Sequence, residues 1–328
     1  MGKMDKKIAI TGTFLDEITA DIPGNNWSEA EWDAEFASMK EAGIKRLFMI
    51  RAGFNRTLAY PSRVIAEREN TYPVYEDKIA QFLKLAGKYD MEFWPGNYVK
   101  ISNDGHYVND LDFDKRIADE IWEHYGKNSP AFGGWYFSKE IGKNVDAVTD
   151  VFVKLARHCK EISGNKPIML SPWLSILPDA PRMAGGHIAE WELPPMDFER
   201  FRKDWEEMFG KLAGAVDIVA FQDGLIPYPY FEEICRIMKS EGEKHGVKVW
   251  INFESFDRDM PFRFPPINWR TLRYKLETAS KVGIEEGITF EYSHFMSPYS
   301  MWPSAGRLRE RYLEWLRGDL PLAELPQA

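Results

Sequence analysis

Short apolar stretches typical of β-strands alternate with amphipathic stretches typical of α-helices along nearly the whole chain. The strand-like stretches cover residues 8–14, 44–50, 91–94, 132–137, 167–170, 216–221, 247–253 and 287–291. Helix-like stretches follow them at 28–42, 76–89, 112–125, 145–162, 198–212, 231–245, 269–282 and 305–316. Eight strands, each followed by a helix, is the number found in a TIM barrel. The sequence therefore predicts an α/β fold, a single (β/α)8 barrel that spans residues 1–328 as one domain.

The connections of this predicted barrel are of two kinds. Those that lead into a strand, such as Gly43 and Gly246, are very short. Those that follow a strand are long, at 52–75, 95–111, 171–197, 222–230, 253–268 and 292–304. Barrel enzymes carry their sites on the loops at the carboxyl ends of the strands, so we expect the site there. The structural alternative is a doubly wound open sheet, but its glycine-rich first turn is not matched by Thr11-Gly12-Thr13-Phe14.

Charge and composition exclude several classes of partner. The formal net charge is −9 and no basic stripe is present, which argues against nucleic acid and against an anionic membrane surface. The two cysteines, Cys159 and Cys235, fall in helix-like segments and suggest neither a disulfide framework nor a C-x-x-C metal site. The charged start resembles no signal peptide, and no apolar run approaches the ~20 residues of a membrane span. A cytoplasmic location is favoured, unless a leader was removed from the chain.

Carboxylates follow three of the predicted strands. Glu140 comes after the fourth strand, Asp223 after the sixth and Glu254 after the seventh. Two carboxylates on nonadjacent strands can face each other across the barrel mouth, and cleavage of a glycosidic bond needs such a pair. We therefore take Glu140 and Glu254 as candidate catalytic residues. The alternative for each is a surface salt bridge or a helix cap.

Other polar and aromatic residues near the strand ends are candidates for substrate binding. Asp223 lies in a Gln-Asp-Gly turn and is suited to bind a hydroxyl, or only its own backbone. Asp16 and Glu17 also follow a strand, and Arg51 is suited to clamp a carboxylate. Aromatic residues make up 14% of the chain, so some rings should stack on sugars while others fill the core. The candidate set is Asp223, Gln222, Asn252, Arg51, Trp94, Trp135, Tyr136, Trp173, Glu291, Tyr292, His294 and Trp302.

Within this set, Tyr292 and Glu291 are suited to form a dyad that orients the nucleophile, and His294 to donate to a substrate hydroxyl. Structural roles are the alternative for all three. Lys139, directly before Glu140, is expected to be a solvated loop charge.

Metal and cofactor motifs are not found in the sequence. The six histidines are scattered, and no H-x-H or H-E-x-x-H pattern occurs. Neither G-x-S-x-G nor a P-loop is present. We expect no metal and no cofactor.

Several motifs carry a resemblance to a known family, DUF4434, over roughly residues 8–316. They are Ile10-Thr11-Gly12-Thr13-Phe14-Leu15-Asp16, Trp27, Trp32, Gly134-Trp135-Tyr136 with Glu140, Phe221-Gln222-Asp223-Gly224, Asn252-Phe253-Glu254 and Ser293-His294-Phe295-Met296-Ser297-Pro298. The family resembles the TIM barrels of glycoside hydrolases. The wider clan of retaining glycosidases has its acid/base Glu after strand four and its nucleophile Glu after strand seven. The resemblance thus implies that Glu140 is the acid/base, that Glu254 is the nucleophile, and that the substrate is an oligosaccharide or glycoside.

One residue departs from the clan pattern. Lys139 stands where the clan commonly has an Asn that binds the sugar 2-hydroxyl. Two other functions stay open at this point. One is a carbohydrate-binding barrel without catalysis, and the other is a metal-dependent sugar isomerase or lyase with Asp223, Glu254 and His294 as ligands.

Overall fold

The computed structural model describes residues 7–18, 22, 24–140, 146–174, 195–257 and 264–320. Its centre is a parallel eight-stranded sheet with the strand order β5-β2-β1-β11-β10-β9-β8-β7. Isolated parallel bridges from Phe93 to Phe132 and from Gly96 to Tyr136 join β5 to β7 and close the sheet. The strands are β1 (Ala9–Leu15), β2 (Arg46–Met49), β5 (Glu92–Trp94), β7 (Trp135–Phe137), β8 (Ile168–Leu170), β9 (Ile218–Gln222), β10 (Lys248–Glu254) and β11 (Glu286–Phe290).

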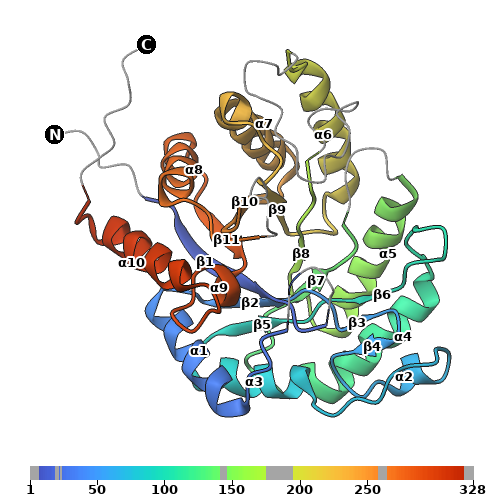
Figure 1. The fold of residues 1–328 in the computed structure, drawn as a ribbon. Helices are drawn as coiled ribbons and strands as arrows, with labels where there is room; N and C mark the ends of the chain where they lie inside the picture. Colours follow the sequence, from blue (N-terminus) through green and yellow to red (C-terminus); the bar gives the residue numbers. More distant parts are fainter. Residues whose placement is uncertain are drawn as a thin grey trace.

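Helices surround this sheet and follow the strands in the predicted order (Figure 1). The chain therefore folds as the predicted (β/α)8 TIM barrel. The helices are α1 (Glu29–Glu41), α3 (Lys78–Lys88), α4 (Leu111–Ile121), α5 (Asp146–Ile162), α6 (Phe198–Leu212), α7 (Tyr228–His245), α8 (Trp269–Val282), the short α9 (Tyr292–Phe295) and α10 (Pro303–Arg317). Among the described residues, no helix combines the length and the apolar character needed to cross a membrane.

The helix starts follow local capping chemistry. Ser28 and Glu31 form a capping box at the start of α1. Several predicted helix starts are shifted by one to three residues, and α4 and α7 show why. Helix α4 begins at Leu111 rather than at residue 112, because the side chain of Asp110 caps it and accepts the N–H of Phe113. Helix α7 begins at Tyr228 rather than at residue 231, since a proline in the first helical turn gives up no hydrogen bond.

Short elements interrupt two loops that the sequence predicts as irregular. Strands β3 (Gly53–Phe54), β4 (Thr57–Leu58) and β6 (Tyr98–Val99) form a small second sheet, and α2 (Arg63–Ala66) follows them. Each contains two to four residues. Such segments are too short to show a hydrophobic period in the sequence. The predicted loop over 171–197 lies mostly outside the described residues.

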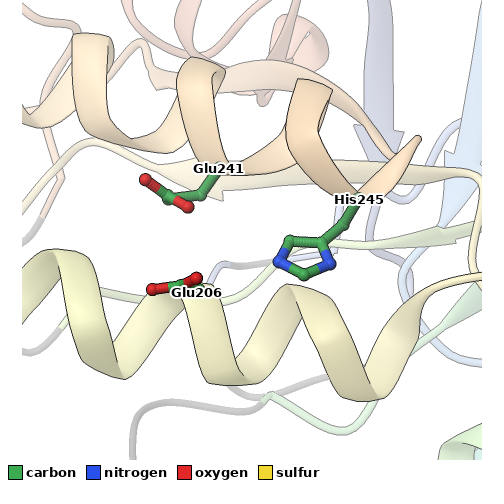
Figure 2. A group of neighbouring side chains, drawn as sticks. All are labelled: Glu206, Glu241 and His245. Carbon is green, nitrogen blue, oxygen red and sulfur yellow. The ribbon is translucent and has the colours of Figure 1, made fainter.

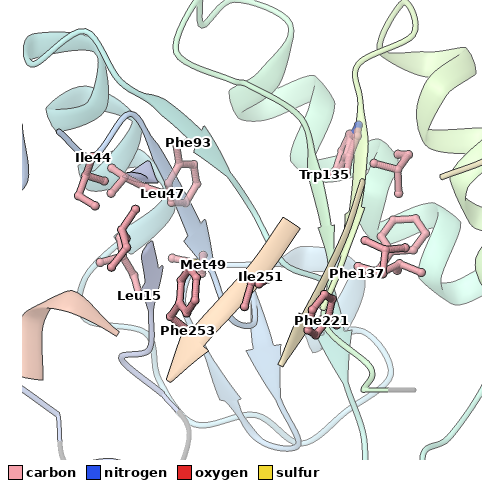
Figure 3. Close-up of a cluster of buried hydrophobic side chains, with 14 of the residues drawn as sticks. Leu15, Ile44, Leu47, Met49, Phe93, Trp135, Phe137, Phe221, Ile251 and Phe253 are labelled. Carbon is pink, nitrogen blue, oxygen red and sulfur yellow. The ribbon is translucent and has the colours of Figure 1, made fainter. Parts of the chain in front are cut away.

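Side chains alternate between the two faces of each barrel strand. One set packs between the strands and the helices, and Figure 3 shows some of its members, including Leu47, Phe93, Trp135, Phe137, Phe221, Ile251 and Phe253. The other set fills the inside of the barrel and comprises Phe14, Phe48, Ile50, Trp94, Tyr136, Met169, Ile218, Ala220, Trp250 and Ile288. This alternation determines which residues at the strand ends face the mouth of the barrel.

Candidate active site

A pocket of about 220 Å³ opens at the carboxyl ends of the barrel strands. It lies on the face that carries the long loops, where the sequence leads us to expect the site. Its described lining has a polar part and an apolar part. The polar side chains are Asp16, Arg51, Tyr136, Glu140, Ser171, Gln222, Asn252 and Glu254, and the apolar ones are Phe14, Ile50, Phe256, Phe264 and Phe290.

The two predicted catalytic carboxylates line this one pocket. Glu254 is the last residue of β10 and is 3% exposed. Glu140 follows β7 by three residues and is exposed. Gln222, at the end of β9, donates a hydrogen bond from Nε2 to Oε1 of Glu140 at 3.2 Å. Residues from three different strands therefore meet at one point, which the sequence alone could not establish.

Asp223 was expected to bind substrate, but it lies outside the described pocket lining. It directly follows β9, is 0% exposed and lies on the side of the strand that faces α8. Its Oδ1 accepts the backbone N–H of Glu254 at 2.9 Å, and its Oδ2 lies 3.1 Å from Nζ of Lys275 on α8. Burial raises the pKa of Asp223 to about 6, against the opposing effect of Lys275. Asp223 thus contacts the backbone of a pocket residue instead of the pocket.

Arg51 provides the positive charge among the described residues that line the pocket. Its side chain lies over the Phe54 ring at 5.0 Å and the residue is 8% exposed. Nε and Nη1 are buried and have no hydrogen-bond partner among the described residues. Tyr136 lies nearby, and its pKa is raised far above the usual value, mainly by burial and further by Glu140, with Arg51 opposing. The Tyr136 phenol therefore stays neutral and can donate a hydrogen bond.

Four predicted tryptophans do not line the described pocket. Trp94 fills the barrel interior, and Trp135 faces the helices, where Nε1 donates to Ser163 Oγ at 3.2 Å. The backbone of Trp173 forms an isolated parallel β-bridge with Gln222, which lines the pocket. Trp302 packs against the apolar cluster that contains Phe256. Two of these rings, Trp94 and Trp135, are therefore core residues, which was the alternative interpretation.

The residues that follow β11, Glu291, Tyr292 and His294, also lie outside the described pocket lining. Glu291 is 1% exposed and caps α9, because Oε1 accepts the backbone N–H of His294 at 2.6 Å. His294 Nδ1 lies 2.5 Å from the same oxygen. The Tyr292 hydroxyl is 2.8 Å from Ser38 Oγ and accepts from Arg309 at 2.6 Å. Among the described residues the Tyr292 hydroxyl and the Glu291 carboxylate thus have other partners than each other, as in the structural alternative, and Tyr292 connects α9 with α1 and α10.

Lys139 is not the solvated charge that the sequence suggested. It is 3% exposed, and its Nζ lies 2.8 Å from Oδ2 of the buried Asp114 on α4. Residues alternate along and just after β7, so Glu140 faces the pocket while Lys139 faces the helices.

The sequence interpretation overlooked Ser171 and the apolar side of the pocket. Ser171 follows β8, in which Met169 faces the barrel interior. Period-two counting from Met169 therefore indicates that Ser171 faces the mouth. The same rule holds for Phe14 and Phe290 on β1 and β11, and for Ile50 and Phe256 just after β2 and β10. The alternation of side chains between the two faces of each strand is the signal in the sequence that identifies these residues.

One group of potential metal ligands lies elsewhere. Glu206 on α6 and Glu241 and His245 on α7 have ligand atoms within 4.8 Å of one another (Figure 2). Lys244 pairs with Glu206 and lies 3.9 Å from Glu241 Oε2, while Arg202 lies 3.0 Å from Glu241 Oε1. These cations already compensate the negative charges of the two carboxylates.

The metal ligands considered for a sugar isomerase do not converge on one point either. Asp223 pairs with Lys275, and His294 pairs with Glu291.

Comparisons with known proteins place the chain among barrel proteins. The model of a family described as a domain of unknown function, DUF4434, matches residues 10–302. No curated protein matches the chain. A crystal structure of a candidate alpha-L-fucosidase from Bacteroides thetaiotaomicron VPI-5482 is similar with a TM-score of 0.86 and 38% identity, over 95% of this chain and 97% of that one.

Two more distant structures share the fold. A GH2 beta-galacturonidase from Eisenbergiella tayi has a TM-score of 0.57 and 11% identity, over 94% of this chain and 51% of that one. An endo-1,4-beta-D-mannanase from Thermotoga petrophila RKU-1 has a TM-score of 0.53 and 13% identity, over 94% of this chain and 99% of that one. At these identities the likeness concerns the fold alone.

Proposed function

The chain belongs to the DUF4434 family, and we propose that it is a retaining glycoside hydrolase in which Glu140 is the acid/base and Glu254 the nucleophile. The observation that carries this proposal is the presence of both carboxylates in one pocket, Glu140 after β7 and Glu254 at the end of β10. The relative at 38% identity, described as a candidate alpha-L-fucosidase, supports the same class of reaction.

The reaction would proceed in two steps. In the first, Glu140 donates its proton to the glycosidic oxygen while the Glu254 carboxylate attacks the anomeric carbon, and the bond to the leaving group breaks. In the second, water attacks the anomeric carbon, Glu140 takes the proton of that water, and the bond to Glu254 breaks. Both residues return to their initial protonation states.

The environments of the two carboxyl groups fit these roles. Glu254 is buried, with its backbone held by Asp223, which suits a nucleophile whose position must be fixed. Glu140 is exposed, which suits a group that exchanges its proton with leaving groups and water.

The rest of the pocket is suited to bind a sugar. Arg51, Tyr136 and Asn252 offer hydrogen-bond donors for hydroxyl groups. Four of the five apolar lining residues are phenylalanines, which can contact the apolar faces of a sugar ring. The combination of apolar side chains with a few polar groups is typical of ligand pockets.

A panel of aryl glycosides tests the proposal, beginning with 4-nitrophenyl α-L-fucoside because of the relative's description. Glu254→Gln should lose turnover with every substrate. Glu140→Gln should slow hydrolysis of glycosides with poor leaving groups by roughly 10²–10⁴-fold, with a much smaller effect on 2,4-dinitrophenyl glycosides, whose leaving group needs no proton. Glu285→Gln, on an exposed residue, is the control.

Two results would contradict the proposal. One is a wild-type protein that binds sugars in calorimetry but cleaves no glycoside, which would indicate a carbohydrate-binding barrel. The other is wild-type turnover that Glu254→Gln leaves unchanged. Product NMR separates retention from inversion, because retention preserves the anomeric configuration in the first-formed sugar.

A further inference from the structure

We infer that the turn formed by Gln222, Asp223 and Gly224 is a positioning element that fixes both catalytic carboxylates relative to each other. This inference rests on the proposed function. Each residue of the turn makes a different contact: Gln222 with the side chain of Glu140, and the other two with the backbone and the carboxylate of Glu254. Three consecutive residues therefore link groups that belong to β7 and β10.

Gln222 acts on Glu140. Its Nε2 donates to the Ser171 carbonyl oxygen at 3.0 Å and to Glu140 Oε1 at 3.2 Å. A carbonyl oxygen can only accept, so the contact with Ser171 fixes which end of the Gln222 amide carries the hydrogens. Oε1 of Glu140 consequently receives a hydrogen bond. In the acid form of Glu140, the proton is therefore placed on Oε2, and that oxygen would face the leaving group.

Asp223 acts on the backbone of Glu254. Its Oδ1 accepts the N–H of Glu254 at 2.9 Å, and its own N–H donates to the Asn252 carbonyl at 3.2 Å. The ion pair with Lys275 holds the carboxylate in place, with 0% and 6% of the two side chains exposed. The ends of β9 and β10 are thus joined where the nucleophile leaves the strand.

Gly224 acts on the Glu254 carboxylate. A Cβ atom on Gly224 would lie 1.7 Å from Oε2 and 2.4 Å from Oε1 of Glu254. Gly224 is not among the glycines with positive φ, so its backbone conformation is open to alanine. The carboxylate itself therefore excludes a side chain at this position. Since a carboxylate is the flexible end of its side chain, alanine would displace it without breaking the fold.

Gly224→Ala is the first test. We expect kcat to fall by about 10²-fold or more, as for an approximately 1 Å misplacement of a reacting group, with little change in Tm and a displaced Glu254 carboxylate in the crystal structure. Gly87→Ala in α3 is the matched control, because its Cβ would meet only Ala131 at 3.9 Å. A Gly224→Ala protein with wild-type kcat and an unmoved carboxylate would overturn the inference.

Gln222→Met is the second test. It keeps the length of the side chain and removes the donor to Glu140. Without that donor the ionised form of Glu140 is less stabilised, so the alkaline limb of the pH–rate profile should move to higher pH by about 0.5–1. If Gln222 had only a structural role, the substitution would lower Tm and leave the alkaline limb of the profile in place. An unmoved limb therefore contradicts the role assigned to Gln222.

Asp223 requires double variants, because its removal leaves Lys275 buried and unpaired. Asp223→Ala with Lys275→Met removes both charges and should recover stability relative to Asp223→Ala alone, while kcat stays low and KM changes little. Asp223→Asn with Lys275→Met keeps an oxygen acceptor for the Glu254 N–H and should recover kcat. Equal kcat in the two double variants would show that the contact with Glu254 has no positioning role.

These results are distinguishable from failure of the proposed function. If the wild type cleaves no glycoside, the function fails, and the crystal structure of Gly224→Ala still decides whether the turn positions Glu254. If the wild type is active and Glu254→Gln is inactive while all turn variants behave like wild type, only the inference fails.

Discussion

The ammonium group of Lys139 lies 2.8 Å from the Asp114 carboxylate, and both side chains are almost completely buried. Lys139 directly precedes the candidate acid/base but faces α4. Its charge is thus used to bind a helix to the end of a barrel strand. Burial raises the pKa of Asp114, while Lys139 opposes this effect.

We predict that Lys139→Met destabilises the protein by about 3–5 kcal/mol, because it leaves the Asp114 carboxylate buried without its cation. The double variant Lys139→Met with Asp114→Leu should recover most of this loss, since it removes both buried charges. Urea unfolding measures both free energies. A single variant as stable as wild type would show that Asp114 finds another partner or stays protonated at no cost.

A second buried acid, Glu35, predicts a pH dependence of stability. Glu35 is 0% exposed, and its Oε2 accepts a hydrogen bond from Ser297 Oγ at 2.6 Å. Burial raises its pKa from 4.5 to about 7. The folded protein therefore holds this proton more tightly than the unfolded chain. Its contribution to stability is fully present below about pH 4.5 and is lost as the pH rises to about 7.

Glu35→Gln should remove this contribution to the pH dependence. Compared with wild type, the variant should lose less stability between pH 4.5 and 8, by on the order of 3 kcal/mol. Glu17, whose pKa burial also raises to about 7, acts in the same direction and remains in the variant. Unfolding free energies at the two pH values, with Glu285→Gln as the control, check the prediction. Identical slopes for wild type and Glu35→Gln would refute it.

The barrel could be predicted from the sequence because the pattern of a strand followed by a helix occurs eight times along the chain. All eight strands and the helices that follow them were expected, and each pairing reinforces the same parallel order. The ends of elements were less accurate: the predicted strand at 132–137 is only Trp135–Phe137. The two-residue strands β3, β4 and β6 could not be predicted, because each is too short to show a period and because β3 pairs with β6 across a long sequence separation, Gly53 with Tyr98.

The site was predictable in part. Position after a predicted strand singled out Glu140, Glu254, Gln222 and Arg51, and the structure brings these four residues to one pocket. The same rule failed for residues such as Asp223 and Lys139. They are next in sequence to residues that line the pocket, but their own side chains point to the other face of the strand, toward the helices. Their partners, such as Lys275 for Asp223, are distant in sequence, so only the folded structure reveals them.

Trp135 provides a test of this distinction. Its indole packs between β7 and the helices and donates to Ser163, so Trp135→Phe should reduce stability by about 1–3 kcal/mol through lost packing and a lost hydrogen bond. The KM of any substrate should not change, because the ring does not line the described pocket. A large rise in KM at unchanged stability would instead indicate a sugar contact, as first expected from the sequence.

Arg51 should show the opposite behaviour. Its Nε and Nη1 are buried without hydrogen-bond partners among the described residues, so the unliganded protein gains no hydrogen bonds from these two atoms. A sugar that supplies acceptor oxygens would gain the full benefit of a charged donor, about 1.5–3 kcal/mol, or roughly 10–150-fold in affinity. Arg51→Met should therefore weaken sugar binding by this factor while Tm changes by only a few degrees. Calorimetry of sugar binding and thermal unfolding of the free protein separate the two effects. A collapse of Tm with unchanged affinity would mean that Arg51 serves the fold, through contacts such as its cation over the Phe54 ring, and not the binding of sugar.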